Sequence, residues 1–409
     1  MGLAPRRRGR GGAVSTPARR PRMRLGVNGA FLTTGRGGMG TFARSLLRGL
    51  LTAAPEIEIV LYCPREARTV LLREDPWTQG IHFVDTPTVD HAVGQRVLRM
   101  GTELAWLPGR ARRDGIDVLH HAANIGPPFG SVPSVLTVHD LMWRHYPSTH
   151  PASSRAMLSL VTPAALRAAD RVTTVSRFSA RDIEQAFRLA PGTVTVIPLG
   201  PGKERTPGDA QAARARHRLG DRTVVLSMGV GFENKNVARL LEAFARVGPA
   251  RDLMLVHTGG PAVEGARWQA LASTLGISDR VRFPGYESDT TDQEVEDLFA
   301  AATALVHPSL FEGFGLPLVE AMRRGVPVAA SDRNALPEVG GDAVLWFDPT
   351  DVGAIADAIA RLADEPALRD VLIANGLRQA ATFSWEHTAA RYASIYHELA
   401  GHPAAAPTP

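Results

Sequence analysis

From Met23 onward, short runs of apolar residues alternate with longer segments whose apolar positions recur at helical spacing. In the first half of the chain, seven runs are predicted strands: MRLGVNGAF, IEIVLYC, IHFV, IDVLHHA, SVLTVHD, RVTTVS and VTVIPLG. Helical segments such as TFARSLLRGLL and PAALRAAD lie between several of them. Repeated alternation of this kind, with apolar strands, predicts a parallel sheet that helices cover on both faces.

The alternation stops at a Pro- and Gly-rich stretch, Pro198 to Gly202, which is typical of a linker. The polar, Arg-rich segment after it contains no strand pattern. Six further strand runs then follow: TVVLSMGVG, LMLVHTGG, VRFPGY, ALVHPS, VPVAAS and AVLWFD. The sequence therefore predicts an α/β protein of two facing Rossmann-like domains. Parallel sheets bind ligands at the carboxyl ends of their strands, so we expect the site in the cleft between the domains.

The division of the chain follows from these patterns. A length of 409 residues is too long for one ordinary core and agrees with two domains. The near-terminal segment FSWEHTAARYASIYHEL has helical spacing. We predict a basic arm over residues 1–22, a first domain over 23–200, a second domain over 201–382, a carboxyl-terminal helix over 383–400 and a tail over 401–409.

The strongest candidate for a binding site lies between the strand run ALVHPS and the segment LPLVEAMRRG. Gly313 and Gly315 come where the strand gives way to a helix, and Pro317 stands where a first helical residue is expected. Glycines at this junction let unpaired backbone amides and the positive end of the helix face one small volume. Such a volume favours an anion.

Two carboxylates flank this junction. Glu312 lies in the glycine loop and can face whatever follows the phosphate, whereas Glu320, in the first turn of the predicted helix, can accept hydrogen bonds from hydroxyl groups further along the ligand. A phosphate with polyhydroxyl groups on both sides suits this arrangement, and a nucleotide sugar is such a molecule. The alternative interpretation is an ordinary helix start with two solvated carboxylates.

The segment HPSLFEGFGLPLVEAMRRGVPVAAS, with two glutamates eight positions apart, resembles the donor-binding motif of the family 4 retaining glycosyltransferases of the GT-B fold. The resemblance implies that Glu312 and the backbone of Gly313, Phe314, Gly315 and Leu316 meet the donor sugar and phosphates. It also implies that Glu320 binds the ribose. The carboxyl-terminal segment resembles the family's last helix, which crosses back to support the first domain.

A glycine-rich loop, Gly35 to Gly40, follows the first predicted strand and matches the G-x-G-x-x-G dinucleotide pattern. We reject a nicotinamide site because the glycines come several residues after the strand and the second strand ends without an acid to hold a ribose. The loop resembles the amino-terminal loop of the same family. Gly37 and Gly38 are therefore candidate donor-binding residues, with a purely structural turn as the alternative.

Histidines end two of the predicted strands. His139 ends SVLTVHD, and this position suits a hydrogen bond to a sugar hydroxyl in the cleft. The resemblance places this histidine near the reacting sugar, although a lone histidine is more often structural. His120 and His121 make a poor metal pair because neighbouring strand residues face opposite ways, so we interpret them as structural or acceptor-side residues.

Lys235 lies in GVGFENKNVARLLEAF, between a strand and a helix, where an ammonium group can neutralise a diphosphate leaving group. A solvated surface lysine is the alternative. The family usually has an Arg five residues earlier, whereas this chain has Val230. A related branch with a neutral residue there and a later Lys-Asn is closer to this sequence and favours a mannose-type donor such as GDP-mannose. Arg36 is a candidate to complete the contacts to the leaving group.

The formal net charge of +5 belongs to the amino-terminal arm. Residues 1–22 contain seven Arg and no acid, so the remainder carries 5 − 7 = −2. The arm lacks the apolar segment of a signal peptide and is predicted to be disordered. It is either an inert extension before a start at Met23 or a weak anchor to anionic lipid or nucleic acid. The single cysteine, Cys63, favours a reducing cytoplasm and is expected to be buried at a strand end.

We therefore predict a retaining hexosyltransferase that moves a sugar from a nucleotide diphosphate sugar to a hydroxyl of a saccharide, lipid-linked glycan or secondary metabolite. His139, Lys235 and Glu312 are the expected catalytic residues, and no metal or other cofactor is expected, because no Asp-x-Asp site stands out. The expected location is the cytoplasm, with peripheral contact to the inner membrane face through basic residues such as Arg112, and no nucleic acid partner is expected. The alternatives are a nucleotide-sugar epimerase, a phosphorylase or a non-catalytic nucleotide-sugar-binding protein.

Overall fold

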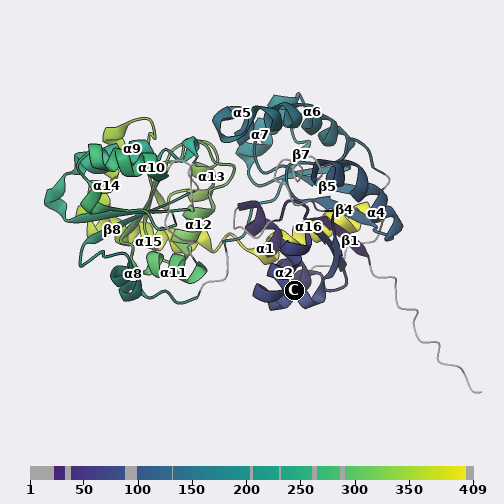
Figure 1. Cartoon of the computed structure of the whole chain (residues 1–409), viewed down its shortest axis with the longest axis horizontal. Coiled ribbons are helices and arrows are strands. Elements are labelled where there is room, and N and C mark those ends of the chain that lie inside the picture. Colours follow the sequence, from purple (N-terminus) through teal and green to yellow (C-terminus); the bar gives the residue numbers. More distant parts are fainter. Residues whose placement is uncertain are drawn as a thin grey trace, which may run out of the picture.

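The computed structural model describes residues 23–32, 38–87, 99–130, 132–202, 206–229, 232–259, 265–285 and 291–401. They form two lobes, each built on one sheet whose strands all pair in parallel (Figure 1). The order of the first, seven-stranded sheet is β3-β2-β1-β4-β5-β6-β7, and that of the second, six-stranded sheet is β10-β9-β8-β11-β12-β13. The predicted α/β architecture is confirmed.

The first sheet consists of β1 (Arg24–Asn28), β2 (Glu58–Cys63), β3 (His82–Asp85), β4 (Val118–His121), β5 (Ser134–Thr137), β6 (Arg171–Thr174) and β7 (Val194–Val196). Its helices are α1 (Gly38–Ala53), α2 (Arg65–Glu74), α4 (Leu107–Arg113), α5 (Met142–His145), α6 (Ala152–Ala168) and α7 (Arg177–Phe187). A π-helical turn, Thr102–Trp106, leads into α4. Six of the seven predicted runs contain one of these strands, and β3 extends one residue beyond the run IHFV.

The second sheet consists of β8 (Thr223–Met228), β9 (Leu253–Thr258), β10 (Val281–Arg282), β11 (Ala304–His307), β12 (Val328–Ser331) and β13 (Val344–Phe347). Its helices are α8 (Ala210–Arg216), α9 (Val237–Val247), α10 (Gly265–Thr274), α11 (Asp292–Ala301), α12 (Leu316–Arg323), α13 (Leu336–Gly340), α14 (Val352–Asp364) and α15 (Pro366–Ala380). Every residue of β9, β11 and β12 is buried, as expected for strands that helices cover on both faces.

The predicted helical segment PAALRAAD is the last part of a longer helix. Helix α6 starts at Ala152 and continues through Pro163 to Ala168. A proline inside a helix removes the hydrogen bond to the carbonyl group four residues earlier, which belongs to Ser159. Because Ser159 is exposed, water can bind that carbonyl group, and the helix continues past the proline.

The chain crosses between the lobes twice, and the two crossings are bonded to each other. The linker after β7 carries the first crossing, and α16 (Trp385–Leu399) completes the second. The Trp385 indole donates a hydrogen bond to the Pro201 carbonyl, and the Thr388 hydroxyl donates one to the Pro198 carbonyl at 2.7 Å. The hinge between the lobes is therefore one packed unit.

Helix α16, drawn in yellow in Figure 1, lies across the first lobe and packs against α1. The Tyr392 hydroxyl lies 3.0 Å from the Thr137 hydroxyl, and the Tyr396 hydroxyl lies 2.8 Å from Nδ1 of His120. Nε2 of His120 lies 2.8 Å from the same Thr137 hydroxyl. These contacts give His120 a structural role, one of the two roles expected from the sequence.

Cys63 is fully buried at the last position of β2, as predicted, and burial raises the pKa of its thiol to about 12. The helices of the described residues include none with the length and apolar character needed to cross a lipid bilayer.

Candidate active site

The loop between β11 and α12 forms the centre of the site. Gly315 caps α12 with a φ of +103°, and a Cβ there would lie 2.5 Å from Cδ2 of Leu336, so glycine is required for two reasons. Pro317 is the second residue of α12 rather than the first. In the described part of the chain, no side chain caps this helix, so its positive end is available to an anion.

Glu312 lies just before this helix and is held by two basic side chains. Its Oε1 accepts hydrogen bonds from Nζ of Lys235 at 2.6 Å and from Nε2 of His307 at 2.9 Å. Burial by itself would raise the pKa of Glu312, but the Lys235 charge and the His307 hydrogen bond outweigh it and lower the pKa well below its usual value. Glu312 is therefore a carboxylate at neutral pH and accepts hydrogen bonds rather than donating a proton.

Lys235 reaches Glu312 because two loops of the second lobe are bonded together. Lys235 ends a short 3₁₀ helix, Glu233–Lys235, that follows β8. The neighbouring Asn234 donates its side-chain amide to the Phe311 carbonyl at 3.1 Å, and its own carbonyl accepts from the Leu310 amide at 2.7 Å. Val230, the departure from the family pattern, and Arg36 lie outside the described residues.

The strand-end histidine and the glycine loop come together across the lobes. A Cβ on Gly313 would lie 2.8 Å from the carbonyl oxygen of His139 and 2.8 Å from Cβ of Asp140. Only glycine allows this close approach. Two motifs separated by more than 170 positions in the sequence thus meet at one point, next to Glu312.

The His139 ring has a defined tautomer. Nε2 lies 3.0 Å from the Ala122 carbonyl, which can only accept, so Nε2 carries the hydrogen. Burial lowers the pKa of His139 to about 4, although the Ala122 hydrogen bond acts in the opposite direction, so the ring is neutral at pH 7. Nδ1 is then a hydrogen-bond acceptor, and the ring edge is fixed against Phe42, with centroids 4.7 Å apart.

The other predicted donor residues are placed as follows. Phe314 is buried with its ring against Phe383, so its backbone rather than its side chain is left to meet a donor. Gly38 is the first residue of α1, and Gly37 lies outside the described residues. Glu320 is the fifth residue of α12 and therefore lies beyond the first turn, which corrects the expected position. Its carboxyl group lies against Gly202 of the linker.

Sequence reasoning missed several residues that contact the site. His307 was part of the quoted strand run, but only the structure shows that it binds Glu312. The Ser176 and Ser179 hydroxyls donate to the Gly313 carbonyl, and Glu338 accepts hydrogen bonds from first-lobe amides. No pattern in the sequence predicts the contacts of the two serines and of Glu338, because each joins segments of different lobes.

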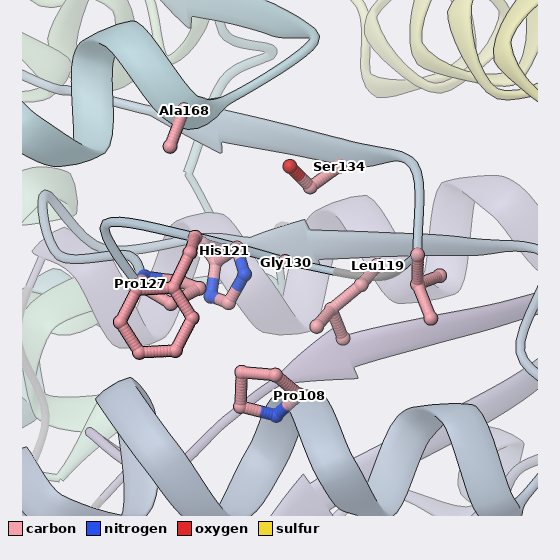
Figure 2. Close-up of a pocket in the computed structure, with 9 residues that line it drawn as sticks. Pro108, Leu119, His121, Pro127, Gly130, Ser134 and Ala168 are labelled. Carbon is pink, nitrogen blue, oxygen red and sulfur yellow. The ribbon is translucent and has the colours of Figure 1, made fainter.

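A separate cavity lies in the first lobe, beside α4 (Figure 2). His121, Pro127 and Pro108 point toward it, and Phe129 and Leu119 also line it. The space open to the centre of a water molecule is about 10 Å³, which suits about one water. None of the predicted donor residues lines this cavity, so it is too small and wrongly lined to be the site of a sugar donor.

Comparison with known proteins agrees with this geometry. The family model described as "Glycosyl transferases group 1" matches residues 209–379, and the model described as "Glycosyltransferase Family 4" matches residues 36–201. The O-antigen chain mannosyltransferase B of Escherichia coli is 29% identical over 387 residues, which cover 88% of this chain and 96% of the relative. The MMP alpha-(1->4)-mannosyltransferase of Mycolicibacterium hassiacum is 35% identical over 241 residues, which cover 57% of this chain and 55% of the relative.

Solved structures share the two-lobe fold. Sucrose-phosphate synthase from Thermosynechococcus elongatus has a TM-score of 0.71 at 20% identity, over 92% of this chain and 99% of that structure. Anabaena HepE in complex with UDP-glucose has a TM-score of 0.69 at 18% identity, over 92% of this chain and 100% of that structure. The predicted GT-B fold is confirmed. Because the two family models together cover both lobes, this chain belongs to the group 1 glycosyltransferases with a family 4 amino-terminal lobe.

Proposed function

We propose that this glycosyltransferase moves a mannose-type sugar from a nucleotide diphosphate sugar to a hydroxyl group of a saccharide or lipid-linked glycan, with retention of configuration. The main support for the proposal is the arrangement of charged and polar groups around α12. An ionised Glu312, held by Lys235, lies beside the uncapped start of α12, and the neutral His139 lies across from it on the other lobe.

Lys235 and α12 supply the positive charge in this mechanism. The ammonium group has three hydrogens, of which one is donated to Glu312, so the others can be donated to diphosphate oxygens. As the bond between the sugar and the diphosphate breaks, negative charge develops on the phosphate, and Lys235 and the helix end stabilise it. No divalent ion is needed for this neutralisation.

Glu312 and His139 hold the sugar. Glu312, as a carboxylate, accepts hydrogen bonds from sugar hydroxyls, and His139 accepts one at Nδ1. The departing phosphate oxygen takes the proton of the acceptor hydroxyl, while the acceptor oxygen bonds to the anomeric carbon on the face that the phosphate leaves. Configuration is therefore retained, and catalysis depends mainly on positioning and electrostatics.

The names of the relatives guide the choice of substrate. Two of them are mannosyltransferases, one for an O-antigen chain and one named for an alpha-(1->4) linkage. A solved neighbour of low identity holds UDP-glucose. We therefore favour a mannose donor and a saccharide acceptor, and the test compares guanosine and uridine donors directly.

A lipid-linked acceptor would bring the first lobe close to a membrane. In the first lobe Arg99 pairs with Glu103 and Arg110 pairs with Asp114, so the charges of these two arginines are partly neutralised. Arg112, at the end of α4, is exposed and can meet anionic headgroups. Sedimentation with anionic vesicles, compared with neutral ones, tests this part of the proposal.

The test of the proposed function uses the purified protein with GDP-mannose, UDP-glucose and a panel of saccharide acceptors. We expect a glycosylated product by mass spectrometry, retained anomeric configuration by NMR, and unchanged turnover with EDTA. Glu312→Ala and His139→Ala should reduce turnover.

Three other outcomes would point to a different function. Free phosphate consumption without an acceptor would indicate a phosphorylase, and an altered nucleotide sugar without an acceptor would indicate an epimerase. Nucleotide binding without any product would indicate a binding protein, and each result would contradict the proposal.

Gly313→Ala tests the contact between the lobes. The added methyl group would overlap the His139 carbonyl and the Asp140 side chain, so the lobes would have to move apart. We expect kcat to fall at least about tenfold, because small displacements of reacting groups are costly. Gly109→Ala is the matched control, since a Cβ there has nothing within 4 Å. Equal turnover in the two variants would contradict the close approach.

A further inference from the structure

The amino-terminal end of α7, residues 176–179, contacts the second lobe through hydroxyl groups, amides and an aromatic ring. The Ser176 and Ser179 hydroxyls donate hydrogen bonds to the Gly313 carbonyl at 2.7 Å and 3.2 Å. Both serines are buried. Because the Ser176 oxygen already accepts the Ser179 amide at 3.0 Å as the cap of α7, its hydrogen is left for Gly313.

Glu338 of α13 completes this contact from the second lobe. Its two carboxylate oxygens accept the Arg177 amide at 2.9 Å and the Phe178 amide at 3.2 Å. These are the first two amides of α7, which have no partner inside the helix, and the positive helix end favours the negative charge. Figure 1 shows α13 on the side of the second lobe that faces α5 and α7.

Phe311 provides the third contact. It belongs to the second lobe but is buried against first-lobe rings, with its centroid 4.8 Å from that of His145 and 5.8 Å from that of Phe178. Phe311 and Gly313 are the residues on either side of Glu312 in the chain. The Phe311 ring and the Gly313 carbonyl both contact the first lobe, whereas Asn234 of the second lobe binds the Phe311 carbonyl, and Lys235 and His307 of the second lobe hold the Glu312 carboxylate.

We propose that the start of α7 and Glu338 form a clamp that positions Glu312 and links its position to closure of the lobes. Ser179 and Glu338 are positioning residues in this proposal: Ser179 binds the Gly313 carbonyl next to Glu312, and Glu338 holds the start of α7, which carries this serine. Opening of the lobes breaks the hydrogen bonds to Gly313 and the contacts of Phe311 together, so Glu312 is correctly placed only in the closed state. This inference rests on the proposed role of Glu312 at the donor sugar.

Ser179→Ala and Glu338→Gln test the clamp, with Asp209→Ala as the control because Asp209 caps α8 and its hydrogen bonds to described residues stay within the second lobe. Ser179→Ala removes one hydroxyl and leaves the Ser176 cap. We expect each test variant to lower kcat about three- to tenfold, which corresponds to loss of one or two hydrogen bonds. The Kd for the nucleotide should change less than twofold, because the second-lobe residues that meet the phosphates are intact.

Hydrogen exchange gives a readout that needs no turnover. The peptide covering residues 309–316 should exchange about three- to tenfold faster in both test variants and at the wild-type rate in Asp209→Ala. Unchanged exchange in this peptide, or faster exchange throughout the second lobe together with weaker nucleotide binding, would overturn the clamp. If the wild type transfers no sugar but the peptide responds as expected, the clamp stands and the proposed function fails.

Discussion

Lys235→Ala is expected to lower kcat by about 10²- to 10³-fold, the cost typical of removing one preorganised group that stabilises developing charge in a transition state. Lys235 is the only side chain seen donating a charged hydrogen bond to Glu312 in the described residues, at 2.6 Å, and its own side chain is 18% exposed. The substitution therefore removes the cation proposed for the diphosphate and leaves His307 as the side chain that binds Glu312 among the described residues.

The pH dependence of this variant gives a second check. In the wild type, burial would raise the pKa of Glu312, but Lys235 and His307 together lower it. Without Lys235 the effect of burial is less opposed, so the pKa rises, and the remaining activity should decline as the pH falls toward that value. Arg251→Ala is the matched control, because it breaks an ion pair with Asp364 whose side chains are 38% and 50% exposed. Wild-type kcat in Lys235→Ala would contradict the role assigned to this lysine.

The amino-acid composition makes Lys235 easy to observe. Lys203 and Lys235 are the only lysines among 46 basic residues, so amine-specific reagents have few targets. A nucleotide sugar bound as proposed covers the Lys235 ammonium and should slow its acetylation, with the amino terminus as the internal reference. Acetylation of Lys235 at the same rate with and without nucleotide would contradict the binding mode.

The strands of each lobe were accessible from the sequence because most are short apolar runs with a helix beside them, whereas their order within each sheet came only from the structure. The same logic located Glu312, His139 and Lys235, since each follows a strand and so falls at the carboxyl edge of a sheet. The contacts that these three residues make could not be predicted from the sequence. Whether Lys235 reaches Glu312 depends on how two loops bond to each other, and no local pattern records that.

The positions that sequence reasoning missed share a physical cause. Glu338 and Ser179 lie in segments that look like ordinary helix starts, and their functional meaning comes from the lobe opposite. The start of α6 before Pro163 was not evident for a different reason, because a proline usually marks a helix boundary unless the freed carbonyl group can reach water. Local propensity thus predicts elements well and contacts between distant elements poorly.

Acidification is expected to unfold the protein between about pH 4 and pH 5.5, because buried histidines take up protons only when the chain unfolds. Burial lowers the pKa of His120 and His257 to about 3, and that of His121 and His139 to about 4. In the unfolded chain each would titrate near about 6.5. Below that pH the unfolded state binds more protons than the folded state, so stability falls as the pH falls.

The expected size of this effect is large. Each histidine contributes about 1.4 kcal/mol per pH unit once the unfolded chain is protonated, so four contribute about 5 kcal/mol per pH unit. His139 is partly exposed and contributes the least. Two acids, the buried Glu103 and the partly exposed Asp140, act in the opposite direction, because desolvation raises their pKa and the folded state then binds their protons first. The four histidines outnumber these two acids. A free energy of unfolding of about 5–15 kcal/mol, typical of a protein domain, would therefore fall to zero within a few pH units.

His257→Phe tests the contribution of a single buried histidine to the loss of stability in acid. The His257 ring lies edge-on to Trp268, with centroids 5.1 Å apart, so a phenyl ring of similar shape can replace it. Urea unfolding between pH 4 and pH 8 should give a variant whose free energy of unfolding falls less steeply below pH 6, by about 1.4 kcal/mol per pH unit. His82→Gln is the control, because the His82 side chain is 69% exposed and an exposed imidazole is solvated in both states. Equal slopes for the wild type and His257→Phe would show that burial of this imidazole does not limit stability in acid.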